Sequence, residues 1–257
     1  MIEVSARGIQ FCFNASVGLL EKFTVTDEDR HISPLHRAPW VGTGEIMPED
    51  AVPHLKVLGG DFFCAPFGES EPAVPLHGWP ANSNWKIESV KNGELHAKLN
   101  RLVFGATVTK KLKVIDKHPF VYQKHAFSGG SGQFAVSNHA NLSLPRGGLI
   151  RTSAKAMWET PKDPLESDSK RGRSVLIYPA QSKDPVTFPG QNGFVNLTRY
   201  PWGEGYEDFV IGIEAHGHEL GWTAVTRPDT GDLFLSIRNT KHLPMTMLWH
   251  SNGGRDY

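Results

Sequence analysis

Short segments in which apolar and polar residues alternate recur along most of this 257-residue chain. Successive side chains of a β-strand point to opposite faces, so a period of two is typical of a strand with one buried face. The alternation predicts strands over 95–99, 107–115, 134–144, 209–213, 222–224, 233–237 and 245–249. Helical periodicity is weak, and the best short candidate is the segment 16–22. The sequence therefore predicts an all-β protein built mainly from antiparallel strands.

Turn-forming residues separate these segments along the whole chain. The 26 glycines and 18 prolines are spread throughout, and turns such as Asn92-Gly93 and the Pro-Asp-Thr-Gly of 228–231 precede predicted strands. The segment 160–173 is polar, charged and interrupted by proline, which is typical of a long exposed loop. Strands and turns continue on both sides of that loop, so we expect one domain over residues 1–257.

The charges of the chain balance, with 27 Lys and Arg against 27 Asp and Glu. This balance offers no attraction to nucleic acid or to a membrane surface. The run Lys-Lys-Leu-Lys at 110–113 is expected on the solvated side of a strand. The N-terminus lacks the pattern of a secretory signal, and no stretch approaches the ~20 apolar residues of a membrane span. Cys12 and Cys64 are expected to be reduced and buried, as in a cytoplasmic protein.

The first candidate site lies around His77. The segment 75–85 has the sequence Pro-Leu-His-Gly-Trp-Pro-Ala-Asn-Ser-Asn-Trp and follows a glycine-containing segment over 59–68. Glycine permits tight backbone packing, and a tryptophan face can pack on the C–H face of a sugar ring. The pattern suits a loop that covers a small hydroxylated ligand. It equally suits a turn with a buried histidine and two core tryptophans, and the residues alone leave both interpretations open.

The second candidate site lies around His139. If the segment 135–144 is a strand, Ser137, His139, Asn141 and Ser143 share one face, and most of the alternate residues are apolar. A row of hydroxyl, imidazole and amide groups complements the hydroxyls of a sugar. The alternative is a solvent-facing strand, although such strands usually carry Lys, Glu or Thr.

Together these motifs resemble the aldose 1-epimerase (galactose mutarotase) family. That family has a His-Gly motif followed by an aromatic residue, which matches His77-Gly78-Trp79, and later an Asn-His strand, which matches Asn138-His139. The turn at 228–231 and the Trp-His-Ser-Asn-Gly-Gly-Arg segment at 249–255 are also similar to segments of the family. The resemblance covers roughly residues 30–257, with the motifs in the same order.

The resemblance implies a large antiparallel β-sandwich of galactose mutarotase type. It also implies an isomerase that interconverts the α and β anomers of a monosaccharide, with no metal and no organic cofactor. In the family a histidine gives a proton to the ring oxygen, a role that falls here to His139, and His77 would hydrogen-bond near that oxygen. The residues expected to bind substrate are Gly78, Trp79, Asn82, Asn138, Asn141, Trp249, Asn252 and Arg255.

The general base of the resembled family is a glutamate on a strand beyond the segment that 249–255 resembles. This sequence ends at Tyr257. We expect either that a C-terminal segment with the base and its strand is missing, or that Asp208 or Glu214 supplies the base from the polar side of the strand around 209–213. Missing strands would expose a sheet edge on which a second copy could form a homodimer.

Two other functions fit the same residues. A non-catalytic carbohydrate-binding β-sandwich would carry the same aromatic and polar groups. A hexose-6-phosphate mutarotase would need cations near the substrate, for which Lys155, Arg171 and Arg173 are candidates. His216 and His218 resemble a metal-binding pair, but no third ligand has a suitable spacing, so no metal site is predicted.

Overall fold

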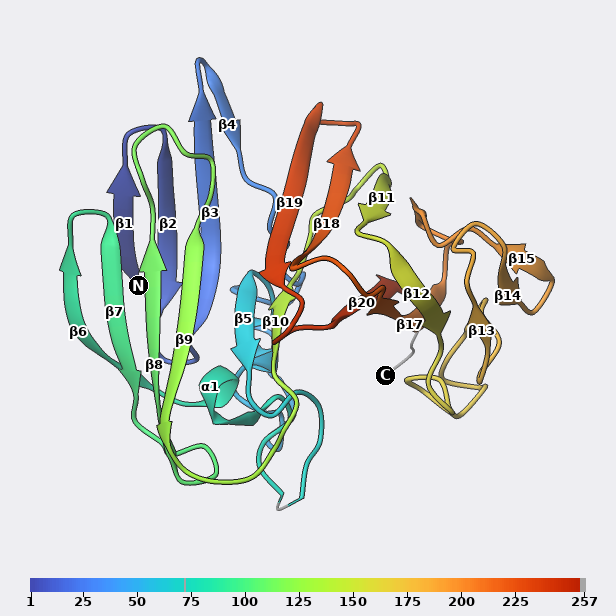
Figure 1. The fold of residues 1–257 in the computed structure, drawn as a ribbon, viewed down its shortest axis with the longest axis horizontal. Helices are drawn as coiled ribbons and strands as arrows, with labels where there is room; N and C mark the ends of the chain where they lie inside the picture. Colours follow the sequence, from blue (N-terminus) through green and yellow to red (C-terminus); the bar gives the residue numbers. More distant parts are fainter. Residues whose placement is uncertain (72, 255–257) are drawn as a thin grey trace. The chain divides into compact units, whose positions relative to one another are not determined.

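The computed structural model describes residues 1–71 and 73–254, and strands joined by turns make up most of its regular structure (Figure 1). These residues contain one α-helix, α1 (Gly78–Asn82), and one 3-10 helix, η1 (Leu55–Val57). Every pairing between the described strands is antiparallel. The prediction of an all-β antiparallel protein is confirmed. No helix of the described residues is long and apolar enough to span a bilayer.

The chain divides into two compact units, Met1–Ser143 and Leu144–Tyr257. The first unit has one sheet in the order β1-β2-β3-β5-β10, with β4 paired to β3, and another in the order β6-β7-β8-β9. Its strands are β1 (Ile2–Ala6), β2 (Ile9–Asn14), β3 (Leu19–Asp27), β4 (Arg30–Ile32), β5 (Asp61–Cys64), β6 (Trp85–Lys91), β7 (Glu94–Leu99), β8 (Ala106–Lys113), β9 (Tyr122–Gly129) and β10 (Ser137–Ala140).

The two sheets of the first unit share one apolar core, to which β2 contributes Phe11 and Phe13 and β8 contributes Val108 and Leu112. Buried and half-buried residues alternate strictly along β8, and this alternation places Lys110 on the inner face. Its ammonium donates a hydrogen bond to the Gly18 carbonyl at 2.7 Å. The prediction that the whole 110–113 run is solvated is therefore wrong at Lys110, because strand parity turns that side chain inward.

The strand β5 is buried on both faces and connects this core to the candidate site. All four of its residues are buried. Phe63 packs in the core between the sheets, whereas Phe62 and Cys64 belong to a second apolar cluster that includes Ala81 of α1. The face of β5 that carries Phe62 is the one on which the candidate site lies.

The second unit has two four-stranded sheets, in the orders β16-β11-β18-β19 and β13-β12-β17-β20, and the hairpin β14-β15. Its strands are β11 (Gly148–Thr152), β12 (Lys155–Glu159), β13 (Gln181–Ser182), β14 (Phe188–Gly190), β15 (Gly193–Val195), β16 (Arg199–Tyr200), β17 (Tyr206–Glu214), β18 (Leu220–Arg227), β19 (Asp232–Asn239) and β20 (Met245–Asn252). Its core comprises Trp158, Leu176, Phe188, Leu197 and Val210, with half-buried apolar side chains around them.

Two local predictions differ from the structure. The segment 16–22 is not helical: β3 begins at Leu19, and its apolar residues pack in two clusters. A short apolar run fits a helix or a strand equally well, so its periodicity does not distinguish the two kinds of secondary structure. The strand predicted over 134–144 is confined to Ser137–Ala140, although Phe134 and Val136 still pack against the core. The predicted loop over 160–173 contains no helix or strand.

Candidate functional site

Three histidines meet around Phe62 in the first unit. The ring centroids of His54 and His77 lie 5.2 Å apart, and those of His77 and His139 lie 5.7 Å apart. The Phe62 ring stacks on His139 at 4.7 Å and lies 5.3 Å from His54 and 5.8 Å from His77. The structure therefore brings together the two histidines singled out in the sequence, although 62 positions separate them, and it adds a third.

Each histidine is carried by a different element. His139 lies on β10 directly opposite Phe62 of β5, so the strand register fixes the stacking of the two rings. His77 immediately precedes α1, and His54 immediately precedes η1. The three rings thus converge from two loops and one strand.

His77 occupies a left-handed backbone conformation, with φ of 67°. Such a conformation is uncommon for a residue other than glycine, and it is maintained here by hydrogen bonds on both sides. The His77 amide donates to the Gly68 carbonyl at 3.2 Å, and the His77 carbonyl accepts from the Ala65 amide at 3.3 Å. The Gly68 amide donates to Nδ1 of the ring at 3.2 Å. Because Nδ1 accepts, the neutral ring carries its proton on Nε2.

His54 is oriented by Asn82 of α1. The Asn82 amide nitrogen donates to the carbonyls of Leu76 and Gly78 at 2.7 and 2.8 Å. Its oxygen accepts from the His54 backbone amide at 3.2 Å and lies 2.9 Å from Nδ1 of His54. Asn82 was predicted to bind substrate, but its contacts give it a supporting role, because all of these hydrogen bonds are to the protein.

The three imidazoles are held in the neutral form. Burial, and to a smaller extent the neighbouring His139 and His54, lower the pKa of His77 to about 3. Burial and His54 lower the pKa of His139 to about 4. Burial also lowers the pKa of His54, against the opposing effect of its hydrogen bond with Asn82. At neutral pH each ring therefore offers one N–H donor and one nitrogen lone pair.

A cavity of about 410 Å³ adjoins this cluster through Phe67. The Phe67 ring lies 5.2 Å from that of His77 and also lines the cavity. Aromatic walls are completed by Phe104 and Phe134, and the polar lining includes Glu69 and Glu71. The cavity has the size and mixed lining of a small-molecule site.

The other predicted residues of the first unit have more varied surroundings. Gly78 is buried at φ of 74°, and a side chain there would collide with the Ala65 carbonyl. Trp79 is half-buried, with the Arg101 guanidinium 5.0 Å from its ring centroid. Asn138 is exposed on β10, and the Asn141 amide donates to the Gly60 carbonyl at 3.2 Å. Gly78 and Asn141 therefore have structural roles. Asn138 is opposite Phe63, so its side chain points to the other face of the sheet from His139, and Trp79 packs against the core that contains Phe63.

Three predicted site residues, Asp208, Trp249 and Asn252, belong to the second unit, and Arg255 lies outside the described residues. The Asp208 carboxylate is buried and accepts hydrogen bonds from the Val175 amide, the Leu176 amide and the Tyr178 hydroxyl, at 3.0, 3.1 and 3.1 Å. Both oxygens hold the 175–178 segment, which argues against the predicted role of Asp208 as general base.

Trp249 and Asn252 of β20 are likewise bonded within the second unit. The Trp249 indole donates to the Glu207 carboxylate at 2.6 Å, and the Asn252 amide donates to the Gly203 carbonyl at 3.0 Å. These contacts tie β20 to β17 and to the preceding turn, so the structure gives both residues structural partners.

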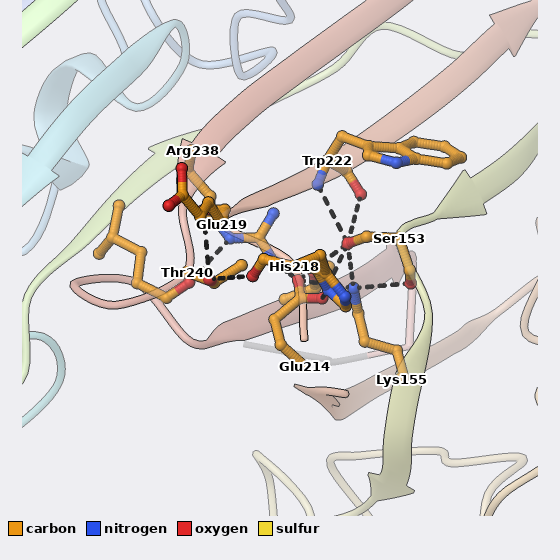
Figure 2. A network of polar contacts seen from close by, with 10 residues as sticks. Ser153, Lys155, Glu214, His218, Glu219, Trp222, Arg238 and Thr240 are labelled. Carbon is orange, nitrogen blue, oxygen red and sulfur yellow. Dashed lines mark hydrogen bonds and ion pairs between the residues drawn. The ribbon is translucent and has the colours of Figure 1, made fainter. Parts of the chain in front are cut away.

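Glu214, the alternative base, is the centre of a buried ion-pair network (Figure 2). Its carboxylate accepts from Ser153 Oγ, from Lys155 Nζ at 2.7 Å, from His218 Nε2 at 3.1 Å and from the Arg238 guanidinium. Burial alone would raise the pKa of Glu214, but the hydrogen bonds of Lys155, His218 and Ser153 outweigh it and lower the pKa. Glu214 therefore stays ionised and committed to these partners.

The three cationic residues that are candidates for binding a sugar phosphate also have partners within the protein. Lys155 is buried in the Glu214 network, Arg171 pairs with Glu166, and Arg173 donates to the Gly205 and Gly253 carbonyls. All three lie in the second unit. Their partners stabilise the fold.

No family model, curated protein or solved structure matches this chain. Within the described residues, no group of three or more His, Cys, Asp or Glu side chains is placed to hold a metal ion.

Sequence reasoning missed His54, Phe62 and Phe67. Phe62 and Phe67 lie in the glycine-containing segment that precedes His77, and the buried DFFC run of β5 could have drawn attention to Phe62. His54 precedes an ordinary apolar stretch, and nothing local marks it. Its importance comes from Asn82, which lies 28 positions away.

Proposed function

We propose that this protein is an aldose 1-epimerase-like enzyme that interconverts the α and β anomers of a monosaccharide, on a β-sandwich of galactose mutarotase type. The observation that carries the proposal is the meeting of His77 and His139, each from one of the two family-like motifs, at a single cluster. The neutral state of both rings supports it further, because uncharged imidazoles can donate and accept hydrogen bonds with sugar hydroxyls.

The residues around the cluster suit a sugar. Phe67, which lies against His77 and lines the cavity, offers an apolar face for the C–H face of the ring. The Nε2–H of His77 is available to a ring oxygen, since Nδ1 is taken by the Gly68 amide. His139 would act on the same oxygen, as the family resemblance implies.

The first prediction concerns His139. We expect the protein to anomerise at least one aldose above the spontaneous rate, and His139→Ala to lower that rate on the order of 10²–10⁴, the range for losing an acid–base group. The measurement is NMR exchange between anomers, screened over the common aldoses. His216→Ala, at an exposed histidine of the second unit, is the matched control and should leave the rate unchanged. A His139→Ala rate within a few-fold of the parent would remove His139 from the reaction.

A non-catalytic carbohydrate-binding protein is the second candidate. The observation that favours it is the engagement of both predicted carboxylate bases, Asp208 and Glu214, with structural partners. Sugar binding seen by ligand NMR titration, with no anomerisation above the spontaneous rate, would select this function over the enzyme.

The second prediction concerns the charge of the sugar. Glu69 and Glu71 line the cavity beside Phe67, so we expect glucose 6-phosphate to bind about two- to tenfold more weakly than glucose. The double change Glu69→Gln with Glu71→Gln should remove most of that difference, and Glu204→Gln, at an exposed position of the second unit, should not. Ligand NMR titration measures the dissociation constants of both sugars. Tighter binding of the phosphate by the parent would favour the hexose-6-phosphate mutarotase instead.

A further inference from the structure

Ring opening of a sugar hemiacetal requires a group that takes the proton of the anomeric hydroxyl. Asp208 holds the 175–178 segment with both oxygens, and Glu214 is paired with Lys155 and Arg238. Neither carboxylate has a free oxygen for this step without breaking its present contacts. Among the described residues, the histidine cluster offers other nitrogen atoms that can take this proton.

We propose that His54 is the proton acceptor of this site, with Nε2 as the accepting atom and Asn82 as the residue that positions it. The inference rests on the proposed function and names a residue for which neither the motifs nor the family resemblance gives a role. Its basis is the hydrogen bonding of His54 and His77, which fixes different protons on the two neutral rings.

The orientation of the Asn82 amide is determined by its partners. Its nitrogen faces two backbone carbonyls, of Leu76 and Gly78, which can only accept. Its oxygen faces the backbone amide of His54, which can only donate. The same oxygen lies 2.9 Å from Nδ1 of His54, so Nδ1 must carry the proton. In the neutral ring the lone pair is then on Nε2.

His77 has the opposite arrangement. Its Nδ1 accepts from the Gly68 amide, so its proton is on Nε2. The two rings are 5.2 Å apart at their centroids and meet edge-on, at 63°. A ring with its lone pair on Nε2 therefore neighbours a ring with its proton on Nε2. A hemiacetal needs one group of each kind, because its hydroxyl and ring oxygens are attached to the same carbon.

The step balances with neutral histidines. His54 Nε2 takes the proton of the anomeric hydroxyl and becomes an imidazolium. The bond between the anomeric carbon and the ring oxygen breaks, and the aldehyde forms. His139, which the proposed function assigns to the ring oxygen, passes the proton taken by His54 on to that oxygen. His77 donates a hydrogen bond to that oxygen from Nε2 and keeps its own proton. Closure on the other face of the aldehyde reverses these transfers and gives the other anomer, with His54 neutral again.

The surroundings of His54 limit where the proton can go. Only 4% of the residue is exposed, and the rings of Phe62 and His77 lie against it. Among the described residues no side chain or backbone group donates to its Nε2, whereas its Nδ1 is committed to Asn82. A proton taken at Nε2 in so dry a place returns to the bound sugar sooner than it escapes to solvent.

The first test reads the tautomers of the unsubstituted protein. Nitrogen-15 NMR at neutral pH should show the proton on Nδ1 of His54 and on Nε2 of His77. This readout needs no activity and no variant, so it is independent of the proposed function and of whether a variant folds. A proton on Nε2 of His54 would overturn the inference and leave the proposed function standing.

The second test uses the sugar that the parent protein anomerises best. His54→Ala should still bind that sugar by NMR titration and should lose on the order of 10²-fold or more in rate. Added imidazole should restore a substantial part of the lost rate in this variant and none in the His216→Ala control. A His54→Ala rate within a few-fold of the parent, with His139→Ala inactive, would place the proton acceptor elsewhere. A parent that binds sugars without anomerising them would overturn the proposed function together with this inference.

Discussion

Replacing Glu214 with glutamine is expected to lower the free energy of unfolding by about 3–5 kcal/mol, the cost of removing one partner from a buried ion pair. The side chains of Glu214 and Lys155 are 3% and 2% exposed, and that of Arg238 is 12% exposed. Glutamine has nearly the same shape but no charge, so both cations would remain buried without their counter-charge (Figure 2). Glu214 ends β17, whereas Arg238 lies on β19 of the other four-stranded sheet. The loss would therefore weaken the joint between the two sheets of the second unit.

Urea unfolding followed by tryptophan fluorescence measures this effect. Glu219→Gln is the matched control: Glu219 is exposed in the same region, and the change should stay within about 0.5 kcal/mol of the parent. Combining Glu214→Leu with Lys155→Met should recover part of the stability relative to Glu214→Gln, since it removes one of the two buried cations and leaves only Arg238 without its counter-charge. A loss below about 1 kcal/mol for Glu214→Gln would mean that water or movement of Arg238 compensates the missing charge.

The strands were predictable because most of them bury one face. Along β7 and β8 the buried residues alternate with more exposed ones, and this alternation is the period of two in the sequence. β17 also alternates, but Asp208 and Glu214 are on its buried face and the apolar Phe209, Ile211 and Ile213 are half-buried.

The parity of β8, read without regard to charge, would also have placed Lys110 inside. The charge of Lys110 favoured a position on the surface. In the structure, however, the Gly18 carbonyl and the rings of Phe13 and Trp85 hold its ammonium in the core.

The candidate site was predictable only in part. His77 and His139 stand in unusual local sequences, and the strand register and the α1 turn bring them together. His54 depends on a hydrogen bond to Asn82, and Asp208 depends on three donors of the 175–178 segment. Such partners are set by tertiary packing, so no local pattern could show that His54 belongs to the cluster or that Asp208 is already bonded.

Acidification is expected to destabilise the protein strongly below pH 6.5, because several histidines are buried in the neutral form. Burial lowers the pKa of His250 to about 3 and that of His125 well below its usual value. The unfolded chain binds a proton near pH 6.5 and the folded form does not. Stability that is present above pH 6.5 is therefore lost as the pH falls toward the folded pKa. Asp61 acts in the opposite direction, because burial raises its pKa to about 6, and offsets part of the loss between pH 6 and 4.

The variant His250→Phe tests how much one of these histidines contributes to the pH dependence of stability. The His250 ring stacks on Trp202 at a centroid distance of 3.4 Å, and its Nδ1 is buried without a hydrogen-bond partner in the described structure. Phenylalanine keeps an aromatic ring there and removes the group that must stay unprotonated. With a folded pKa of about 3, His250 accounts for a loss of about 3 kcal/mol between pH 7 and pH 4.5, which the variant should not suffer. Urea unfolding at both pH values measures the difference, with His242→Phe, at an exposed position, as the control. Equal pH dependence in the parent and His250→Phe would show that His250 is protonated in the folded protein, for instance because water reaches its ring.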